Sequence, residues 1–163
     1  MFMLVLFYFM QKDPFNEIVL FLDSKGVDHI PYKHKPVVTS KEAEDVRVSR
    51  DAVGLKSLLF KTEKGHVLLV LPGERKVSSR KVRHLLGVKD VRMVSPEEVY
   101  SIMGCEVGGC YPLGFICGLK MIVDSSVKEA ERVVFNIGRR DRSIEMTWGE
   151  FERFIPFKEA SIS

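Results

Sequence analysis

The sequence predicts an α+β fold, in which a mixed, largely antiparallel twisted sheet is flanked by helices. Helix-like and strand-like patterns interleave along the 163 residues without the regular spacing of repeated β-α-β units. Two apolar runs, residues 55–61 and 66–71, are separated only by Thr62-Glu63-Lys64-Gly65, which is typical of a β-hairpin. Internal repeats, low-complexity tracts and linkers are not found, so we expect one domain over residues 13–163.

Capping residues mark the ends of the expected helices. Asp13-Pro14, followed by apolar residues at helical spacing and by Gly26, predicts a first helix. The capping box Thr39-Ser40-Lys41-Glu42 predicts a helix over about residues 41–46. Further helices are expected from Ser78 or Ser79 to Gly87, from Ser95-Pro96 to Gly104, and from Thr147 onward.

Short extended segments fill most of the remaining chain. They are expected at residues 29–33, 91–94, 120–124, 132–137 and 143–146, with a turn or short helix over 126–131. Residues 104–114 contain four glycines and a proline, so we expect a loop there.

Composition limits the possible functions only loosely. The chain has 25 basic and 22 acidic residues, and the net charge of +3 permits an RNA partner without requiring one. Three cysteines, Cys105, Cys110 and Cys117, form no CxxC pair and have no histidine at ligand spacing. We therefore expect them to be packing residues in a reducing cytoplasm, with neither a disulfide framework nor a metal site.

The N-terminal segment is apolar from Met1 to Met10. A helix of ten residues is too short to cross a bilayer, which takes about 20 residues. The segment also lacks the basic region and the cleavage site of a signal peptide. We expect residues 1–12 to be an extension that packs on the domain or forms an oligomer contact, with no role at a membrane.

Two features could carry chemistry. The glycines of residues 104–114 would let the backbone approach a ligand and direct several N–H groups at it, although the segment could equally be a plain connector. Lys56 begins an apolar strand, where it could donate to a carbonyl, carboxylate or phosphate, or could simply extend its side chain to the surface. No G-x-S-x-G motif or protease-like cysteine motif occurs, so any hydrolysis would depend on positioning and electrostatics.

Basic residues are grouped at two places. Arg139 and Arg140 follow a predicted strand and could contact phosphates, or could lie in a solvated turn. Lys76, Arg80, Lys81, Arg83 and Lys89 could form a basic helix face, for which a solvated surface is the favoured interpretation.

Four stretches occur in an order and with gaps that one known family shares. They are Ile30–Pro36 with Val38-Thr39 and Glu42-Ala43; Leu55–Phe60 followed by Leu69–Gly73; Gly108–Gly114; and Val123-Asp124, Asn136–Arg140 and Ile144–Met146. Over about Asp13–Glu152 the chain thus resembles the YbaK and prolyl-tRNA-synthetase-associated editing domains, which deacylate wrongly charged tRNAs. Residues 1–12 lie outside the resemblance.

The resemblance implies an aminoacyl-tRNA deacylase that acts in trans on mischarged tRNA, with alanine or cysteine on proline tRNA as the usual cases. It implies Lys56, Gly108 and Gly109 as catalytic residues, without a cofactor or metal. The implied substrate-binding residues are Tyr32, His34, Thr39, Ser40, Pro112, Asp124, Arg139 and Arg140. The implied partners are the aminoacylated 3′ end of tRNA and prolyl-tRNA synthetase, in the cytoplasm.

Two other interpretations stay open at this point. The domain could bind a tRNA end or an aminoacyl group without hydrolysing it, as a partner of a synthetase. It could also be an assembly protein docked through Met1–Met10. The sequence does not identify the amino acid removed, or whether water or a group of the substrate attacks the ester.

Overall fold

The computed structural model describes residues 13–36, 49 and 51–163 of the chain. The extension over residues 1–12 and the helix expected over residues 41–46 lie outside this part. Four α-helices are present in it: α2 (Pro14–Lys25), α4 (Ser79–Leu86), α5 (Pro96–Met103) and α6 (Trp148–Phe154). Each begins at the expected cap, because the side chains of Asp13, Ser78, Ser95 and Thr147 accept hydrogen bonds from the first helical turn.

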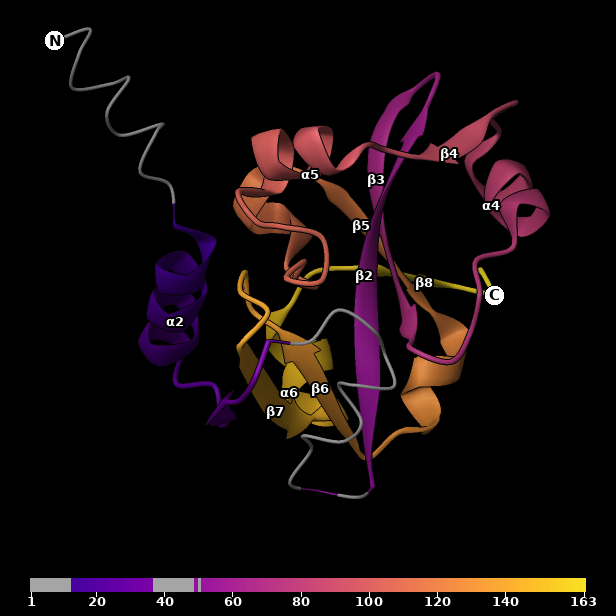
Figure 1. The fold of residues 1–163 in the computed structure, drawn as a ribbon. Helices are drawn as coiled ribbons and strands as arrows, with labels where there is room; N and C mark the ends of the chain where they lie inside the picture. Colours follow the sequence, from indigo (N-terminus) through magenta and orange to yellow (C-terminus); the bar gives the residue numbers. More distant parts are fainter. Residues whose placement is uncertain (1–12, 37–48, 50) are drawn as a thin grey trace, which may run out of the picture.

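The strands form one mixed sheet, as predicted (Figure 1). They are β1 (Ile30–Lys33), β2 (Ala52–Thr62), β3 (Gly65–Pro72), β4 (Val91–Met93), β5 (Lys120–Asp124), β6 (Arg132–Asn136), β7 (Arg142–Thr147) and β8 (Lys158–Ala160). Their order is β1-β7-β6-β2-β3-β5-β8, and β4 also pairs with β2. Four of the seven described pairings are antiparallel and three are parallel, which agrees with the expected mixed, largely antiparallel sheet.

Strand β2 is the centre of the sheet. It forms the expected hairpin with β3 through the turn at Glu63-Lys64. On its other edge, Ala52–Gly54 pair in parallel with β6, and Phe60–Thr62 pair with β4. Between these two pairings, the middle of β2 has a described strand neighbour on one side only. In the described part of the chain, the sheet is therefore open at Lys56.

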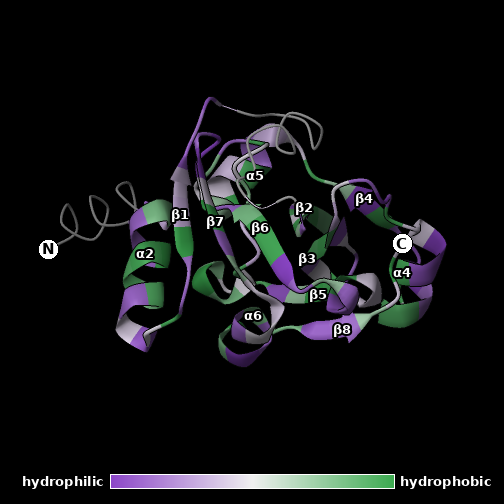
Figure 2. Cartoon of the chain, turned by 90° about the horizontal axis from the view of Figure 1, so that it is seen from below, coloured by the Kyte–Doolittle hydropathy of each residue, from purple (hydrophilic) through white to green (hydrophobic). Residues whose placement is uncertain are grey.

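The two faces of the sheet are covered differently. One face packs against α2, α5, α6 and residues 105–113 in a large core, to which Leu55, Leu59, Phe135 and Ile144 contribute. The opposite face packs against α4 in a smaller core, to which β2, β3, β4, β5 and β8 contribute. Figure 2 shows β1, β7 and β6 side by side, with α4 beyond β3 at the other end of the sheet.

Two short elements were not predicted. Strand β8 has the sequence Lys-Glu-Ala and no apolar alternation, and it exists because it pairs in parallel with β5 at the sheet edge. Gly114–Cys117 form a 3-10 turn (η1), and a second one, η2 (Ser125–Glu129), lies within the turn expected after β5.

Candidate active site

The candidate site is built on the face of β1, β7, β6 and β2 that α4 leaves uncovered. Tyr32 pairs with Ser143, Val134 pairs with Glu145, and Gly54 pairs with Val134. Paired residues point to the same side of a sheet, and so do residues two apart along a strand. The polar residues Tyr32, Lys56, Arg132, Asn136, Ser143 and Glu145 therefore share one side, which we call the polar face.

Glu145 is the most buried charged group of the polar face, with 2% of its surface exposed. Its Oε2 atom accepts from Nε of Arg132 at 3.2 Å and from the hydroxyl of Tyr32 at 3.4 Å. Burial raises the pKa of Tyr32, and the neighbouring Glu145 carboxylate raises this pKa further. The second oxygen, Oε1, is buried and has no hydrogen-bond partner within residues 13–36, 49 and 51–163. The polar face thus keeps one free acceptor, which suits a ligand that donates.

His34 and Ser143 form a hydrogen-bonded pair at the edge of this face. Nε2 of His34 lies 2.8 Å from Oγ of Ser143, and Nδ1 lies 2.7 Å from the carbonyl oxygen of Lys35. A carbonyl can only accept, so Nδ1 carries a proton, and in a neutral imidazole Nε2 is then the nitrogen that accepts from the serine hydroxyl. The ring is therefore oriented with Nε2 directed at Ser143.

Lys56 lies where the sheet opens between β2 and β6. Its Nζ atom donates to the carbonyl oxygen of Gly73 at 3.1 Å, and among the described residues two of its N–H donors have no acceptor. Burial lowers the pKa of Lys56, and the positive charge of Lys76 lowers this pKa further. The side chain is held and partly desolvated rather than extended into solvent.

The glycine-rich loop is fixed to the turn between β6 and β7. The amide of Gly138 donates to the carbonyl of Gly109 at 2.8 Å, and the amide of Gly109 donates to the carbonyl of Glu106 at 2.9 Å. A Cβ atom on Gly109 would lie 3.2–3.3 Å from backbone atoms of Glu106, Gly138 and Arg139. The absence of a side chain at Gly109 therefore lets two backbone segments pack closely. The N–H of Gly109 is already hydrogen-bonded to the carbonyl of Glu106. The N–H of Gly108 has no acceptor among the described residues.

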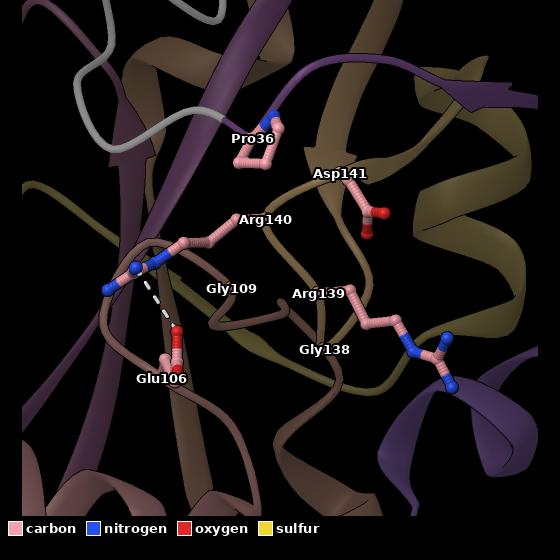
Figure 3. A pocket seen from close by; sticks show the side chains of 7 residues that line it. All are labelled: Pro36, Glu106, Gly109, Gly138, Arg139, Arg140 and Asp141. Atoms are coloured by element: carbon pink, nitrogen blue, oxygen red, sulfur yellow. Dashed lines mark ion pairs between the residues drawn. The ribbon is translucent and has the colours of Figure 1, made fainter.

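A pocket of about 320 Å³ lies at this junction (Figure 3). It is lined by Pro36, Glu106, Gly109, Gly138, Arg139, Arg140 and Asp141. Arg140 donates to the carbonyl of Val107 at 2.8 Å and pairs with Glu106 at 3.1 Å. Arg139 pairs with Asp13 at 2.9 Å and covers the ring of Phe15. Both arginines brace the loop and α2 while part of each guanidinium stays exposed at the pocket.

The other predicted site residues have different surroundings. Asp124 is buried, and its carboxylate accepts from Ser126, Ile162 and Ser163. Burial alone would raise the pKa of Asp124, but these hydrogen bonds outweigh it and lower the pKa. Because Asp124 anchors the C-terminal segment, we do not include it in the site. Pro112 is buried within the loop, and Lys56 is not among the residues that line the pocket.

Thr39 and Ser40 lie outside the described residues. In the described part of the chain, no helix has the length and apolar character needed to cross a membrane. Within the same residues, no group of three or more metal-ligating side chains is found.

Comparisons with known proteins identify the family. A model of the aminoacyl-tRNA editing domain matches residues 34–154, a range that includes the glycine-rich loop, the pocket and every residue of the polar face except Tyr32. The uncharacterized protein YwhH of Bacillus subtilis is 32% identical over 128 residues, covering 78% of this chain and 80% of that protein. The chain therefore belongs to the aminoacyl-tRNA editing domain family.

Other relatives are larger enzymes or share only the fold. A proline–tRNA ligase of Geobacillus sp. is 35% identical over 74 residues, which cover 45% of this chain but only 13% of the ligase. The crystal structure of a proposed trans-editing enzyme for prolyl tRNA synthetase superposes with a TM-score of 0.78 at 23% identity, covering 92% of this chain and 96% of that one. This likeness establishes the fold.

Sequence reasoning missed four residues of the polar face: Arg132, Asn136, Ser143 and Glu145. A signal for two of them was present, because Ser143 and Glu145 alternate with apolar residues in a strand, the pattern of a sheet with one polar face. Their partners Tyr32 and His34 lie more than a hundred residues away in the chain, so the local pattern could not show the contacts.

Proposed function

We propose that this chain is a trans-editing deacylase that hydrolyses the ester between a wrong amino acid and the 3′ end of tRNA. The observation that carries the proposal is the position of Lys56 on the polar face, beside the end of the β2–β6 pairing, where two of its N–H donors have no acceptor in the described part of the chain. Membership of the editing-domain family supports the same reaction.

The chemistry assigned to Lys56 is electrostatic. Its ammonium group donates to the 3′-terminal nucleotide or to the ester, and so holds the carbonyl carbon in reach of the attacking group. The N–H of Gly108 is a candidate second donor to the carbonyl oxygen, whereas the N–H of Gly109 is occupied by Glu106. Tyr32, Arg132 and Glu145 form a connected group that can accept from the amino group of the substrate.

The attacking group is proposed to be water, with His34 as the proton acceptor. The water oxygen bonds to the ester carbonyl carbon, and its proton passes to Nε2 of His34 through the hydroxyl of Ser143. The bond to the tRNA 3′ oxygen then breaks, and this oxygen takes the proton back from Nε2 of His34 through the same hydroxyl, which returns His34 to its starting state. The products are the free amino acid and uncharged tRNA. His34→Gln should lower kcat more than KM, because the proton acceptor acts in the transition state.

The substrate is proposed to be proline tRNA carrying alanine or cysteine. This follows from the relatives, since matched proteins are proline–tRNA ligases and a fold neighbour is described as a trans-editing enzyme for prolyl tRNA synthetase. A panel of alanine, cysteine and proline on proline tRNA would test it by amino acid release. Hydrolysis of the first two, with proline spared, is the expected result.

The decisive variant is Lys56→Ala. Loss of one such donor should lower deacylation by about 100-fold or more while the thermal unfolding temperature changes little. Lys61→Ala is the matched control, because Lys61 lies on the same strand and forms a surface ion pair with Glu98. This variant should keep full activity. Retention of mischarged tRNA without release, in the unmodified protein, would favour a non-catalytic binding module acting with a synthetase.

A further inference from the structure

Residues 75–89 have an unusual charge. This segment contains six basic residues, Arg75, Lys76, Arg80, Lys81, Arg83 and Lys89, and no acidic residue. The whole chain has 25 basic and 22 acidic residues, so the other 148 residues carry 19 basic and 22 acidic ones, a net charge of −3. The positive charge of the protein is therefore concentrated around α4.

Helix α4 directs these charges outward. Val82 is its only buried residue, and it packs in the smaller core together with Val77, Leu85 and Leu86. All six basic residues are exposed. Figure 2 shows separate hydrophilic and hydrophobic bands on α4. We call the exposed side of α4 and its flanking residues the basic surface.

Two of the six cations bind the C-terminal residues, and the other four are available to bind a ligand. Arg75 donates to the hydroxyl of Ser163, and Lys81 donates to Ser161 and to the carbonyl of Ser163. Among the described residues, the side chains of Lys76, Arg80, Arg83 and Lys89 have no carboxylate partner. Arg80 and Arg83 are three residues apart in the helix, so they are neighbours on its surface.

The basic surface lies on the same side of the sheet as the polar face. Lys56, Leu58 and Phe60 alternate along β2 and so point to one side. Leu58 and Phe60 belong to the core that contains Val82 of α4. The segment between β3 and α4 begins at Gly73, whose carbonyl binds Lys56, and it carries Lys76, whose charge acts on Lys56. Positively charged side chains thus extend from Lys56 in the candidate active site, through Lys76, to α4.

We propose that the basic surface binds the phosphate backbone of the tRNA acceptor stem and so delivers the 3′ end to Lys56. This inference rests on the proposed function, because tRNA is the occupant. A segment with six cations and no acidic residue of its own matches a phosphate backbone, which proteins contact with arginine and lysine. A protein partner fits less well, because the segment has no large apolar side chain exposed at the centre of such an interface.

The test compares two double variants that each remove two positive charges. Arg80→Gln/Arg83→Gln changes the basic surface, and Lys25→Gln/Arg153→Gln changes exposed residues of α2 and α6. Binding of uncharged proline tRNA is measured at several salt concentrations. We expect the first variant to bind tRNA roughly tenfold or more weakly at low salt. Its plot of log binding constant against log salt concentration should have a slope shallower by about 2. The second variant should bind within twofold of the unmodified protein.

Two further measurements separate binding from chemistry. A short aminoacyl ester of a CCA trinucleotide lacks the stem, so Arg80→Gln/Arg83→Gln should hydrolyse it at the unmodified rate. Arg80→Lys/Arg83→Lys should restore most of the tRNA affinity, because a phosphate contact needs the charge. Equal tRNA binding by both double variants would overturn the inference. This outcome is also the one expected if the basic surface binds an acidic protein instead of tRNA. Failure of the unmodified protein to release any amino acid would refute the deacylase alone, because the binding comparison does not require hydrolysis.

Discussion

The amide of Gly138 donates a hydrogen bond of 2.8 Å to the carbonyl oxygen of Gly109 and thereby joins the glycine-rich loop to the turn between β6 and β7. Arg140 strengthens this junction through Val107 and Glu106. The position of the loop is thus set by the end of β6, which is the strand beside Lys56 at the opening of the sheet. A small displacement at this junction would move both walls of the pocket.

Gly109→Ala should disturb this junction without preventing folding. The added Cβ would meet backbone atoms at 3.2–3.3 Å, so the loop must move away from Arg139 by a few tenths of an ångström. We expect a loss of about 1–3 kcal/mol in unfolding free energy and a larger proportional loss of deacylation. Gly149→Ala in α6 is the control, because its Cβ would meet only Thr147 at 3.9 Å and alanine favours a helix. Urea unfolding and amino acid release would check both, and full activity of Gly109→Ala would contradict a role for the junction.

Lys76→Gln should raise the pKa of Lys56. Burial and the charge of Lys76 both lower this pKa, so removal of the second cause should shift it upward while burial keeps it below the ordinary 10.5. An NMR titration of labelled lysine side chains would measure the shift. If protonated Lys56 holds the ester, the alkaline decline of deacylation should move to higher pH in the same variant. An unchanged Lys56 titration would show that the two charges do not interact.

The local parts of the fold could be predicted because capping and alternation are local signals. Asp13-Pro14, Ser95-Pro96 and Thr147 each begin a helix as expected, and the β2–β3 hairpin lies where its two apolar runs indicate. Strand β2 begins three residues earlier than its apolar run, because Ala52–Gly54 are extended by pairing with β6, a partner distant in sequence.

The candidate site was predictable only in part. Lys56 and Tyr32 were identified by resemblance, and their positions on one face follow from sheet register, which the sequence alone does not provide. Gly109 was expected to direct its N–H at a ligand, yet that N–H binds Glu106, because the loop turns back on itself. Whether a residue's donor is free depends on the folded loop and not on its composition.

Asp124→Asn should destabilise the C-terminal segment rather than reduce substrate binding. The carboxylate accepts from the amides of Ser126, Ile162 and Ser163, and hydrogen bonds to a charged acceptor contribute roughly 1.5–3 kcal/mol. Because the pKa of Asp124 is lowered in the folded state, its contribution is present above the ordinary pKa of 3.8 and is lost as the pH falls further. Urea unfolding from pH 7 to pH 3 should therefore show a smaller pH dependence for the variant. A raised KM with unchanged stability would instead assign Asp124 to the substrate.

Cys105→Ala should make the thiol of Cys110 less acidic. Sγ of Cys105 donates to Sγ of Cys110 at 3.7 Å, and this bond is the largest cause of the lowered pKa of Cys110, against burial, which raises it. Removal of the donor should move the midpoint of Cys110 alkylation by iodoacetamide to higher pH, since the thiolate is the reacting form.

Cys105→Ser keeps a donor and should shift the midpoint less, and Cys117→Ala serves as the control for loss of a neighbouring thiol. The midpoint separates acidity from access, because a more open thiol would raise the plateau rate at high pH and leave the midpoint unchanged. A midpoint that moves to lower pH in Cys105→Ala would show that the hydrogen bond runs in the opposite direction.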